Sequence, residues 1–145
     1  MSGILKHTDY AARVVLHIAG LGPGAQVPIS EIAKQRLMPA PFVRRVVARL
    51  AAAGILRTAR GNKGGVSLAR PASKISLLDV IRTMESALVL NRCVTSPKDC
   101  PFSDKCPVRR TWRGITHSVE QSLKGVTFDT LLSPRAKTSR RRKEI

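Results

Sequence analysis

Acidic side chains, aromatic rings and long apolar stretches are all scarce in this sequence. Nine Asp or Glu accompany 26 Lys or Arg, giving a formal net charge of +17, and only 3% of the 145 residues are aromatic. No apolar run approaches the roughly 20 residues that a helix needs to cross a bilayer. The N-terminus does not have the pattern of a signal peptide, because Asp9, Arg13 and His17 interrupt its hydrophobic residues. We therefore expect a cytoplasmic protein, with no membrane segment and with a polyanionic partner.

Cysteine is equally sparse, and its placement is uneven. The three cysteines, Cys93, Cys100 and Cys106, all lie within fourteen residues, in a segment that is rich in proline. An odd number of thiols in a reducing compartment favours metal or redox chemistry over a disulfide framework. The spacing is wider than the paired cysteines of common structural zinc sites. The chemistry alone favours an iron–sulfur centre, and it leaves zinc or another metal and thiol–disulfide sensing open.

The basic residues divide the chain into three parts. Residues 1–73 contain eleven Lys or Arg and two acidic residues, whereas residues 74–132 contain nine and six. The last thirteen residues contain six Lys or Arg and one Glu. We predict a DNA-binding domain at 1–73, a cluster-binding loop and dimerisation helix at 74–132, and a basic disordered tail at 133–145.

Three short helices are predicted near the N-terminus, at about residues 9–21, 30–36 and 41–53, with Ser30 capping the second. The third has apolar residues on one face, with Arg44 and Arg45 on the opposite face. The inward positions are Phe42, Val43, Val46, Val47, Leu50 and Ala53. Two helices joined by a tight turn, the second presenting arginines, are typical of a helix-turn-helix. Taken alone, the third helix also fits an ordinary amphipathic surface helix.

A β-hairpin follows, with strands at about 55–59 and 66–70 and a glycine-rich basic tip at 60–65. Glycines permit positive φ angles and close backbone approach at the tip, where Arg60, Asn62 and Lys63 can contact DNA. The tip lacks the spacing of a nucleotide-binding loop, and no helix follows it. The predicted fold is therefore mainly α with a small β-hairpin, a winged helix-turn-helix.

The C-terminal half is predicted to contain two further helices. Ser76 caps the first, and Pro107 opens the second, which is longer. Five apolar residues recur along the second at spacings of three and four: Val108, Trp112, Ile115, Val119 and Leu123. This narrow stripe indicates a dimerisation helix and a homodimer. The alternative is that the stripe packs on its own domain.

Several of these segments together resemble a known family across roughly residues 4–132. The matching stretches are 7–13 (HTDYAAR), 29–33 (ISEIA), 60–71 (RGNKGGVSLARP), 75–81 (ISLLDVI) and the three-cysteine loop. The chain resembles the winged-helix bacterial regulators that include the iron–sulfur repressors IscR, NsrR and RirA. The resemblance implies a transcriptional regulator, most simply a repressor, with an iron–sulfur cluster that responds to oxygen, nitric oxide or iron.

The resemblance also implies which residues bind the cluster. Cys93, Cys100 and Cys106 are the expected ligands, and a four-iron cluster is favoured over a two-iron one. The IscR type has a histidine three residues after its third cysteine, but this chain has Arg109 there. The N-terminus is similar to the NsrR type, in which an aspartate of the other subunit completes the site, so Asp9 is the expected fourth ligand. The alternative role for Asp9 is a helix N-cap, and His7 and His117 are weaker candidate ligands.

Together, the motifs and the resemblance predict a homodimer that binds double-stranded DNA. The expected DNA contacts are Pro41, Phe42, Arg44, Arg45 and Arg49 on the third helix, with Arg60, Asn62 and Lys63 on the wing. One rival is a cluster-free thiol sensor or cysteine-metabolism regulator of the same fold, and another is a metal-binding enzyme or trafficking protein. Enzyme activity is not expected, because no acid, base and nucleophile form a recognisable set.

Overall fold

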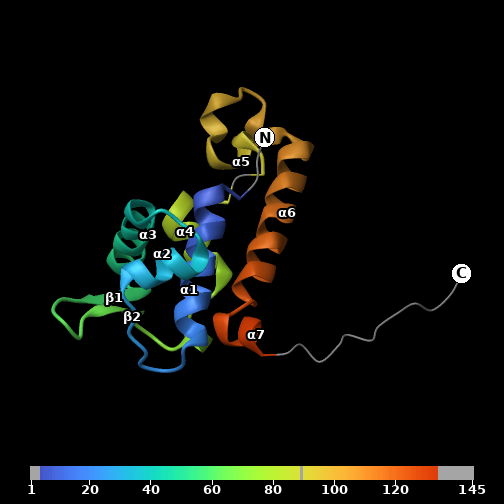
Figure 1. Ribbon diagram of the computed structural model, residues 1–145. Helices are drawn as coiled ribbons and strands as arrows, with labels where there is room; N and C mark the ends of the chain where they lie inside the picture. The colour runs from blue at the N-terminus through green and yellow to red at the C-terminus, as the bar shows by residue number, and fades with distance from the viewer. Residues whose placement is uncertain (1–3, 89, 134–145) are drawn as a thin grey trace, which may run out of the picture.

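A computed structural model describes residues 4–88 and 90–133, which are mostly helical with one antiparallel two-stranded sheet, as predicted (Figure 1). The helices are α1 (Lys6–Gly20), α2 (Ile29–Arg36), α3 (Ala40–Ala52), α4 (Leu77–Glu85), α5 (Arg92–Thr95), α6 (Pro107–Lys124) and α7 (Phe128–Leu132). The strands are β1 (Leu56–Ala59) and β2 (Gly65–Leu68), and 3-10 turns occupy Ala72–Lys74, Pro97–Asp99 and Ser103–Lys105. Among the described residues, every helix is too short or too polar to span a membrane. Apart from Ser133, the predicted basic tail lies outside the described residues.

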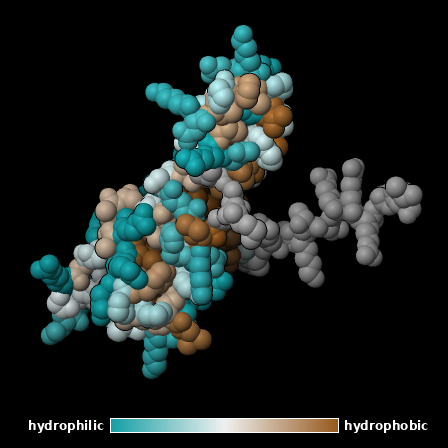
Figure 2. Space-filling view, turned by 90° about the horizontal axis from the view of Figure 1, so that it is seen from above, coloured by the Kyte–Doolittle hydropathy of each residue, from teal (hydrophilic) through white to brown (hydrophobic). Residues whose placement is uncertain are grey.

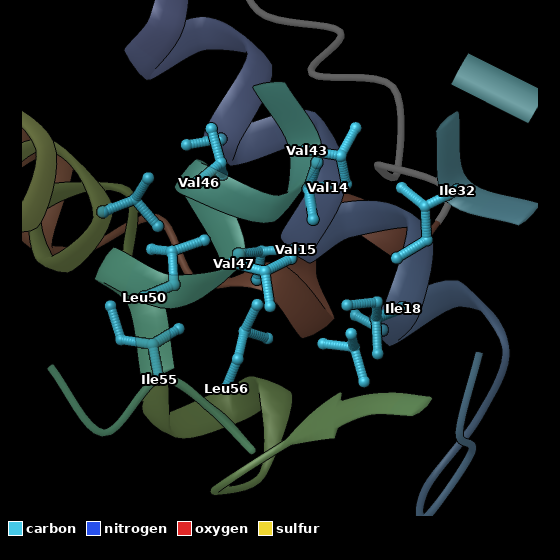
Figure 3. Packing of buried hydrophobic residues seen from close by; sticks show 14 of the residues in the cluster. Val14, Val15, Ile18, Ile32, Val43, Val46, Val47, Leu50, Ile55 and Leu56 are labelled. Atoms are coloured by element: carbon cyan, nitrogen blue, oxygen red, sulfur yellow. The ribbon is translucent and has the colours of Figure 1, made fainter. Parts of the chain in front are cut away.

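Helix α1 is the centre of the core. It packs against α2, α3, α4, α7 and β2, and its Val14, Val15 and Ile18 are at most 1% exposed. The inner face of α3 meets these residues (Figure 3). The buried residues of that face are Val43, Val46, Val47 and Leu50, as predicted, whereas Phe42 is half-buried and Ala53 is exposed. The 3.6-residue period of the sequence therefore identifies most of the packing face of the helix-turn-helix.

Two helix starts differ from their predicted positions. Helix α1 begins at Lys6 with Leu5 as its N-cap, so Asp9 lies in its first turn and is not the cap. Helix α2 begins at Ile29, because Pro28 has the extended backbone of an N-cap residue and Ser30 is already helical. The predicted cap of α4 is confirmed: Ser76 Oγ accepts from the Asp79 N–H, and Asp79 Oδ2 accepts from the Ser76 N–H.

Strands β1 and β2 pair antiparallel, in a register that runs from Leu56 opposite Leu68 to Ala59 opposite Gly65. The backbone of Val27, in the α1–α2 connection, exchanges two hydrogen bonds with Val66, at 3.0 and 2.8 Å. This bridge attaches the hairpin to the helix-turn-helix. A Cβ atom on Gly65 would lie 2.8 Å from the Val27 carbonyl oxygen, so the close approach requires glycine.

Helix α7 was not predicted, although its Phe128 side chain is fully buried. The Phe128 N–H donates to the Ile75 carbonyl at 3.0 Å, and α7 packs on α1. Residues 91–106, which we call the cysteine lobe, lie at the start of α6, far from the wing (Figure 1). The fold therefore places the two expected functional regions at different ends of the molecule.

Candidate nucleic-acid interface and cysteine lobe

The outer face of α3 presents the predicted arginines. Arg44 and Arg45 are exposed, opposite the buried valines, because successive residues of a helix are turned by about 100°. The Arg45 guanidinium carbon lies 5.9 Å from the centroid of the Phe42 ring, and Arg49 Nη2 donates to the Thr83 carbonyl of α4 at 3.2 Å. The Arg44 side chain makes no hydrogen bond or ion pair with any described residue, so it is the arginine of α3 best placed to bind a ligand.

The turn before α3 contains a leucine with an unusual backbone conformation. Leu37 has the left-handed conformation (φ 53°, ψ 46°), and it is 92% exposed. This conformation favours glycine, and a leucine in it is strained. Pro39 is then the N-cap of α3, and the exposed Pro41 follows near the start of the helix. The tightness of the helix-turn-helix turn thus comes from a strained leucine and two prolines.

The predicted wing residues all lie on an exposed tip. Arg60, Asn62 and Lys63 are exposed, and Gly61 has a φ of +100°. A Cβ atom on Gly64 would come within 2.3 Å of the Ala59 carbonyl oxygen, so the tip can close only with glycine there. Hydrophilic side chains project at this end of the molecule (Figure 2, left). Two cations and an amide on a tight loop suit contacts to phosphates or to a groove edge.

The first turns of α1 add cations beside α3. The Tyr10 ring meets the Phe42 ring edge-on, with 5.6 Å between centroids. Lys6 Nζ lies 5.5 Å and the Arg13 guanidinium 5.8 Å from the centroid of Tyr10. Lys6 and Arg13 could not be identified from the sequence as part of this surface, because periodicity does not show that α1 and the start of α3 are neighbours. The cationic surface therefore extends from α3 onto α1.

The predicted fourth ligand, Asp9, is exposed on α1, and it is already partnered. Its Oδ2 lies 2.9 Å from Arg13 Nη2, one turn further along the same helix. Such exposed pairs contribute only about 0.3–0.5 kcal/mol. The carboxylate can thus leave Arg13 at small cost.

A buried histidine lies between α1 and α2. His17 Nδ1 accepts from Arg36 Nη2 at 3.1 Å, and its buried Nε2 has no hydrogen-bond partner among the residues that the structure describes. Burial lowers the pKa of His17 below its usual 6.5, and the nearby Arg36 charge lowers it further, although Glu31 acts in the opposite direction. The imidazole is therefore neutral near pH 7, and its protonation would place two cations side by side within the helix-turn-helix.

The cysteine lobe contains three free, half-buried thiols. Cys93 lies on α5, Cys100 follows a 3-10 turn, and Cys106 is the N-cap of α6. Three soft sulfur donors suit an iron–sulfur cluster or zinc, so the donor set fits the predicted centre. In the described part of the chain, however, no three Cys, His, Asp or Glu side chains converge closely enough to bind one metal ion. Binding would require the lobe to close around the metal.

Arg109 occupies the position at which the IscR type has its histidine, and it has a different role here. Its Nε donates to the Cys93 carbonyl at 3.0 Å, and its Nη1 donates to the Ser103 carbonyl at 3.1 Å. Ser103 is itself buried, and its hydroxyl donates to the Pro97 carbonyl at 2.6 Å. One guanidinium therefore joins two distant points of the lobe to the first turn of α6.

The predicted stripe of α6 is partly exposed. Val108 is 60% and Ile115 43% exposed, while Trp112, Val119 and Leu123 are half-buried. A groove of about 620 Å³ runs along this face, lined among others by Gly114, Ile115, Ser118, Val119 and Leu123. The face toward the rest of the chain is polar: Thr116 is buried, and Glu120 pairs with Arg82 of α4 at 3.5 Å. The described residues thus leave the apolar stripe of α6 only partly covered.

Comparisons with known proteins agree with this architecture. The family model described as "Rrf2: Iron-dependent Transcriptional regulator" matches residues 4–134. Protein aau3 of Rhizobium meliloti (strain 1021) is 33% identical over 91% of this chain and 86% of its own length. A protein of Aquifex aeolicus (strain VF5), named as an HTH-type transcriptional regulator, is 30% identical over 90% of this chain and 92% of its own.

Two solved structures show the same fold. CymR, the global cysteine regulator of B. subtilis, superimposes with a TM-score of 0.76 at 22% identity, covering 91% of this chain and 97% of its own. IscR of T. potens gives a TM-score of 0.69 at 24% identity, covering 90% of this chain and 85% of its own. Identities below a quarter establish the fold but not the ligand.

Proposed function

The chain belongs to the Rrf2 family of transcriptional regulators and has its DNA-binding fold, and from this premise we propose that it is a dimeric repressor whose DNA affinity is set by an iron–sulfur cluster. The observation that carries the proposal is the combination of an exposed cationic surface on α3 and the wing with three free thiols in one lobe. DNA provides the polyanion that the charge of +17 requires.

In the proposed complex, α3 enters the major groove. Arg44 has free donors for guanine, whereas Arg45 and Arg49 also contact Phe42 and the Thr83 carbonyl. Pro41 and Phe42 form the leading end of the helix. The wing residues Arg60, Asn62 and Lys63 contact the backbone or the minor groove, which fixes the orientation of α3 but carries little base information.

The second copy of the chain covers the apolar face of α6. Val108 and Ile115 gain most from dimerisation, because they are the most exposed apolar side chains of the stripe. A two-fold pair of α6 helices would set the separation of the two α3 helices, which must match half-sites about 34 Å apart on DNA. Any rearrangement transmitted to α6 therefore alters DNA affinity.

Cys93, Cys100 and Cys106 would bind the cluster, with Asp9 of the second subunit as the fourth ligand. A bound four-iron cluster supplies a centre that oxygen or nitric oxide degrades. Ligation takes the Asp9 carboxylate from an exposed ion pair with Arg13, which costs little. Closing of the lobe by Cys93, Cys100 and Cys106 would be the conformational change that α6 transmits.

The test measures iron, sulfide and DNA affinity on the same anaerobic preparation. Replacing Cys93, Cys100 or Cys106 by Ala should abolish or strongly reduce iron content and should change the affinity for DNA selected from a random pool by the wild-type protein. Asp9→Ala should weaken cluster retention without unfolding the chain. A colourless wild-type protein after reconstitution, or full iron in all three cysteine variants, contradicts the cluster.

Variants of Arg44 and Lys63 should distinguish sequence-specific contacts with bases from nonspecific contacts with phosphates. Arg44→Ala should cost roughly 1–3 kcal/mol on the selected DNA and much less on random DNA. Lys63→Ala should weaken both about equally and flatten the salt dependence, because phosphate contacts act through counterion release. Fluorescence anisotropy over a salt series measures both effects. An equal loss on the two DNAs for Arg44→Ala means that α3 is not the reading helix.

A second candidate function is a cluster-free regulator that senses thiols or cysteine metabolism. Two observations favour it: the described residues do not gather three ligands around one point, and the fold of a global cysteine regulator superimposes well. In that case the cysteine variants change the response to oxidants or thiols, and the wild-type protein contains no stoichiometric iron or sulfide.

A further inference from the structure

The cysteine lobe is ordered without a hydrophobic core of its own. Of residues 91–106, Ser103 is the single buried one, and Phe102 is 76% exposed. A segment of this kind cannot be ordered by burial of apolar surface, and the sequence suggested that a metal would be needed. Within the described residues, hydrogen bonds are therefore the main interactions that the protein itself provides to hold the lobe in place.

Most of the polar contacts within the lobe are local or exposed. Asn91 caps α5 by accepting from the Cys93 N–H, and Arg92 pairs with Asp99 at 3.1 Å on the surface. Such contacts bend the chain locally, but they do not attach the lobe to the rest of the protein. The two hydrogen bonds of Arg109 do, because they connect α6 with the Cys93 and Ser103 carbonyls, which are sixteen and six residues away.

We propose that Arg109 is the positioning residue of the cysteine lobe, which its guanidinium holds against α6 in the absence of any metal. The planar, always charged group presents several donors in a fixed arrangement, so it can bind two carbonyl oxygens at once. The first of these hydrogen bonds fixes the backbone of Cys93. The second fixes Ser103, whose hydroxyl in turn binds the Pro97 carbonyl in the turn that precedes Cys100. Cys106 is fixed independently as the N-cap of α6.

The inference goes beyond the proposed function, because it does not depend on which ligand the thiols bind. Arg109 lies one residue from Val108, which belongs to the outward apolar face of α6, while its own side chain reaches back to the lobe. Release of the two carbonyls would thus free the lobe at the end of the helix on which dimerisation is proposed to occur.

The experiment uses the full-length, reduced and metal-free protein, and it follows amide hydrogen exchange by mass spectrometry. In Arg109→Gln, peptides within residues 91–106 should exchange at least about fivefold faster, while peptides of α1 and α3 keep their wild-type rates. Arg109→Lys should also exchange faster, because one ammonium cannot reproduce the two-carbonyl geometry. The Cys93 and Cys100 thiols should react several-fold faster with a disulfide reagent in both variants, while Cys106, which α6 holds as its N-cap, should keep its wild-type reactivity.

Arg110→Gln is the matched control, because Arg110 carries the same charge on the same helix, is exposed, and contacts no described residue through its side chain by hydrogen bond or ion pair. Its lobe peptides should exchange at the wild-type rate. Equal lobe exchange in wild type, Arg109→Gln and Arg110→Gln would overturn the proposal, as would faster exchange spread evenly over the whole chain. Because no iron is present, failure here is distinguishable from failure of the cluster proposal.

Discussion

The helix-turn-helix core and the cysteine lobe are stabilised by different kinds of interaction. The core buries aliphatic side chains of α1, α3 and β1 almost completely, and each contributes about 1.5–3 kcal/mol by leaving water. The lobe has hydrogen bonds and surface ion pairs, which contribute about 0.5–1.5 and 0–1 kcal/mol each. The surface proposed to contact DNA is thus carried by the well-packed part of the chain, and the thiols by a part that we expect to open locally while the core stays folded.

The strongest test of this contrast removes a buried ring from the core. Phe128→Ala should destabilise the protein by about 3–5 kcal/mol, because the fully buried side chain leaves a cavity beside Ile75 and α1. Urea unfolding followed by circular dichroism measures the loss, and Leu131→Ala, on the exposed side of α7, should cost far less. If the thiols of Phe128→Ala react faster under native conditions, the lobe shares the cooperativity of the core and the contrast is wrong.

A smaller effect of opposite sign is expected in the turn before α3. Leu37→Gly should stabilise the protein by about 0.5–1 kcal/mol, because relief of the left-handed strain exceeds the entropy that glycine adds to the unfolded chain. Little apolar burial is lost, since Leu37 is almost fully exposed. Thermal melts test the sign, and Leu21→Gly, at a C-cap of ordinary φ, should instead be destabilising. A lower melting temperature for Leu37→Gly would show that the turn is not strained.

Acid should destabilise the core through His17. Its pKa is lowered in the folded state, mainly by burial and then by Arg36, so the unfolded chain binds more protons as pH falls below about 6.5. The stability that neutral His17 provides is fully present above this pH and is lost below it. Urea midpoints between pH 5 and 8 should show the loss in wild type and a flatter profile in His17→Gln. His117→Gln, at an exposed position, should retain the wild-type profile, and equal slopes in all three proteins would rule out His17 as the cause.

The smallest effect on global stability is expected within the lobe. Ser103→Ala removes the hydrogen bond to the Pro97 carbonyl, which contributes about 1 kcal/mol locally. The thermal midpoint should stay within about 1 °C of wild type, while the thiols become more reactive. Ser118→Ala, which removes an exposed helix-internal hydroxyl on α6, should change neither quantity. A lowered midpoint for Ser103→Ala would mean that the lobe and the core unfold together.

The difference between the core and the lobe also explains which parts of the structure could be predicted from the sequence. Helical periodicity identifies Val43, Val46, Val47 and Leu50 as buried, because burial of a helix face repeats at a known spacing. The outward stripe of α6 follows from the same rule. The start of α2 was misplaced because Pro28 already has the geometry of an N-cap, and α7 was missed because five residues are too short to show a period.

The contacts of the lobe leave no comparable signal in the sequence. Arg109 binds backbone carbonyls, which every residue possesses, so nothing in the identity of residue 93 or residue 103 indicates the partner. The edge-on contact of Tyr10 with Phe42 likewise depends on the packing of α1 against α3, which periodicity does not provide. Burial of a helix face repeats at regular intervals along the sequence, whereas each of these contacts occurs once, between residues that are brought together only by the fold.

Trp112 is the chain's one tryptophan, and it lies half-buried on α6, six residues beyond Cys106. Its indole emission therefore reports on a single place in the molecule, between the lobe and the apolar face of the helix. Closing of the lobe, or separation of two subunits, would change the polarity around this ring, whereas a rearrangement of the wing would not. Trp112 thus provides an intrinsic fluorescence signal at the position where sensing and dimerisation are proposed to be coupled, and stopped-flow emission could time each proposed event without any added dye.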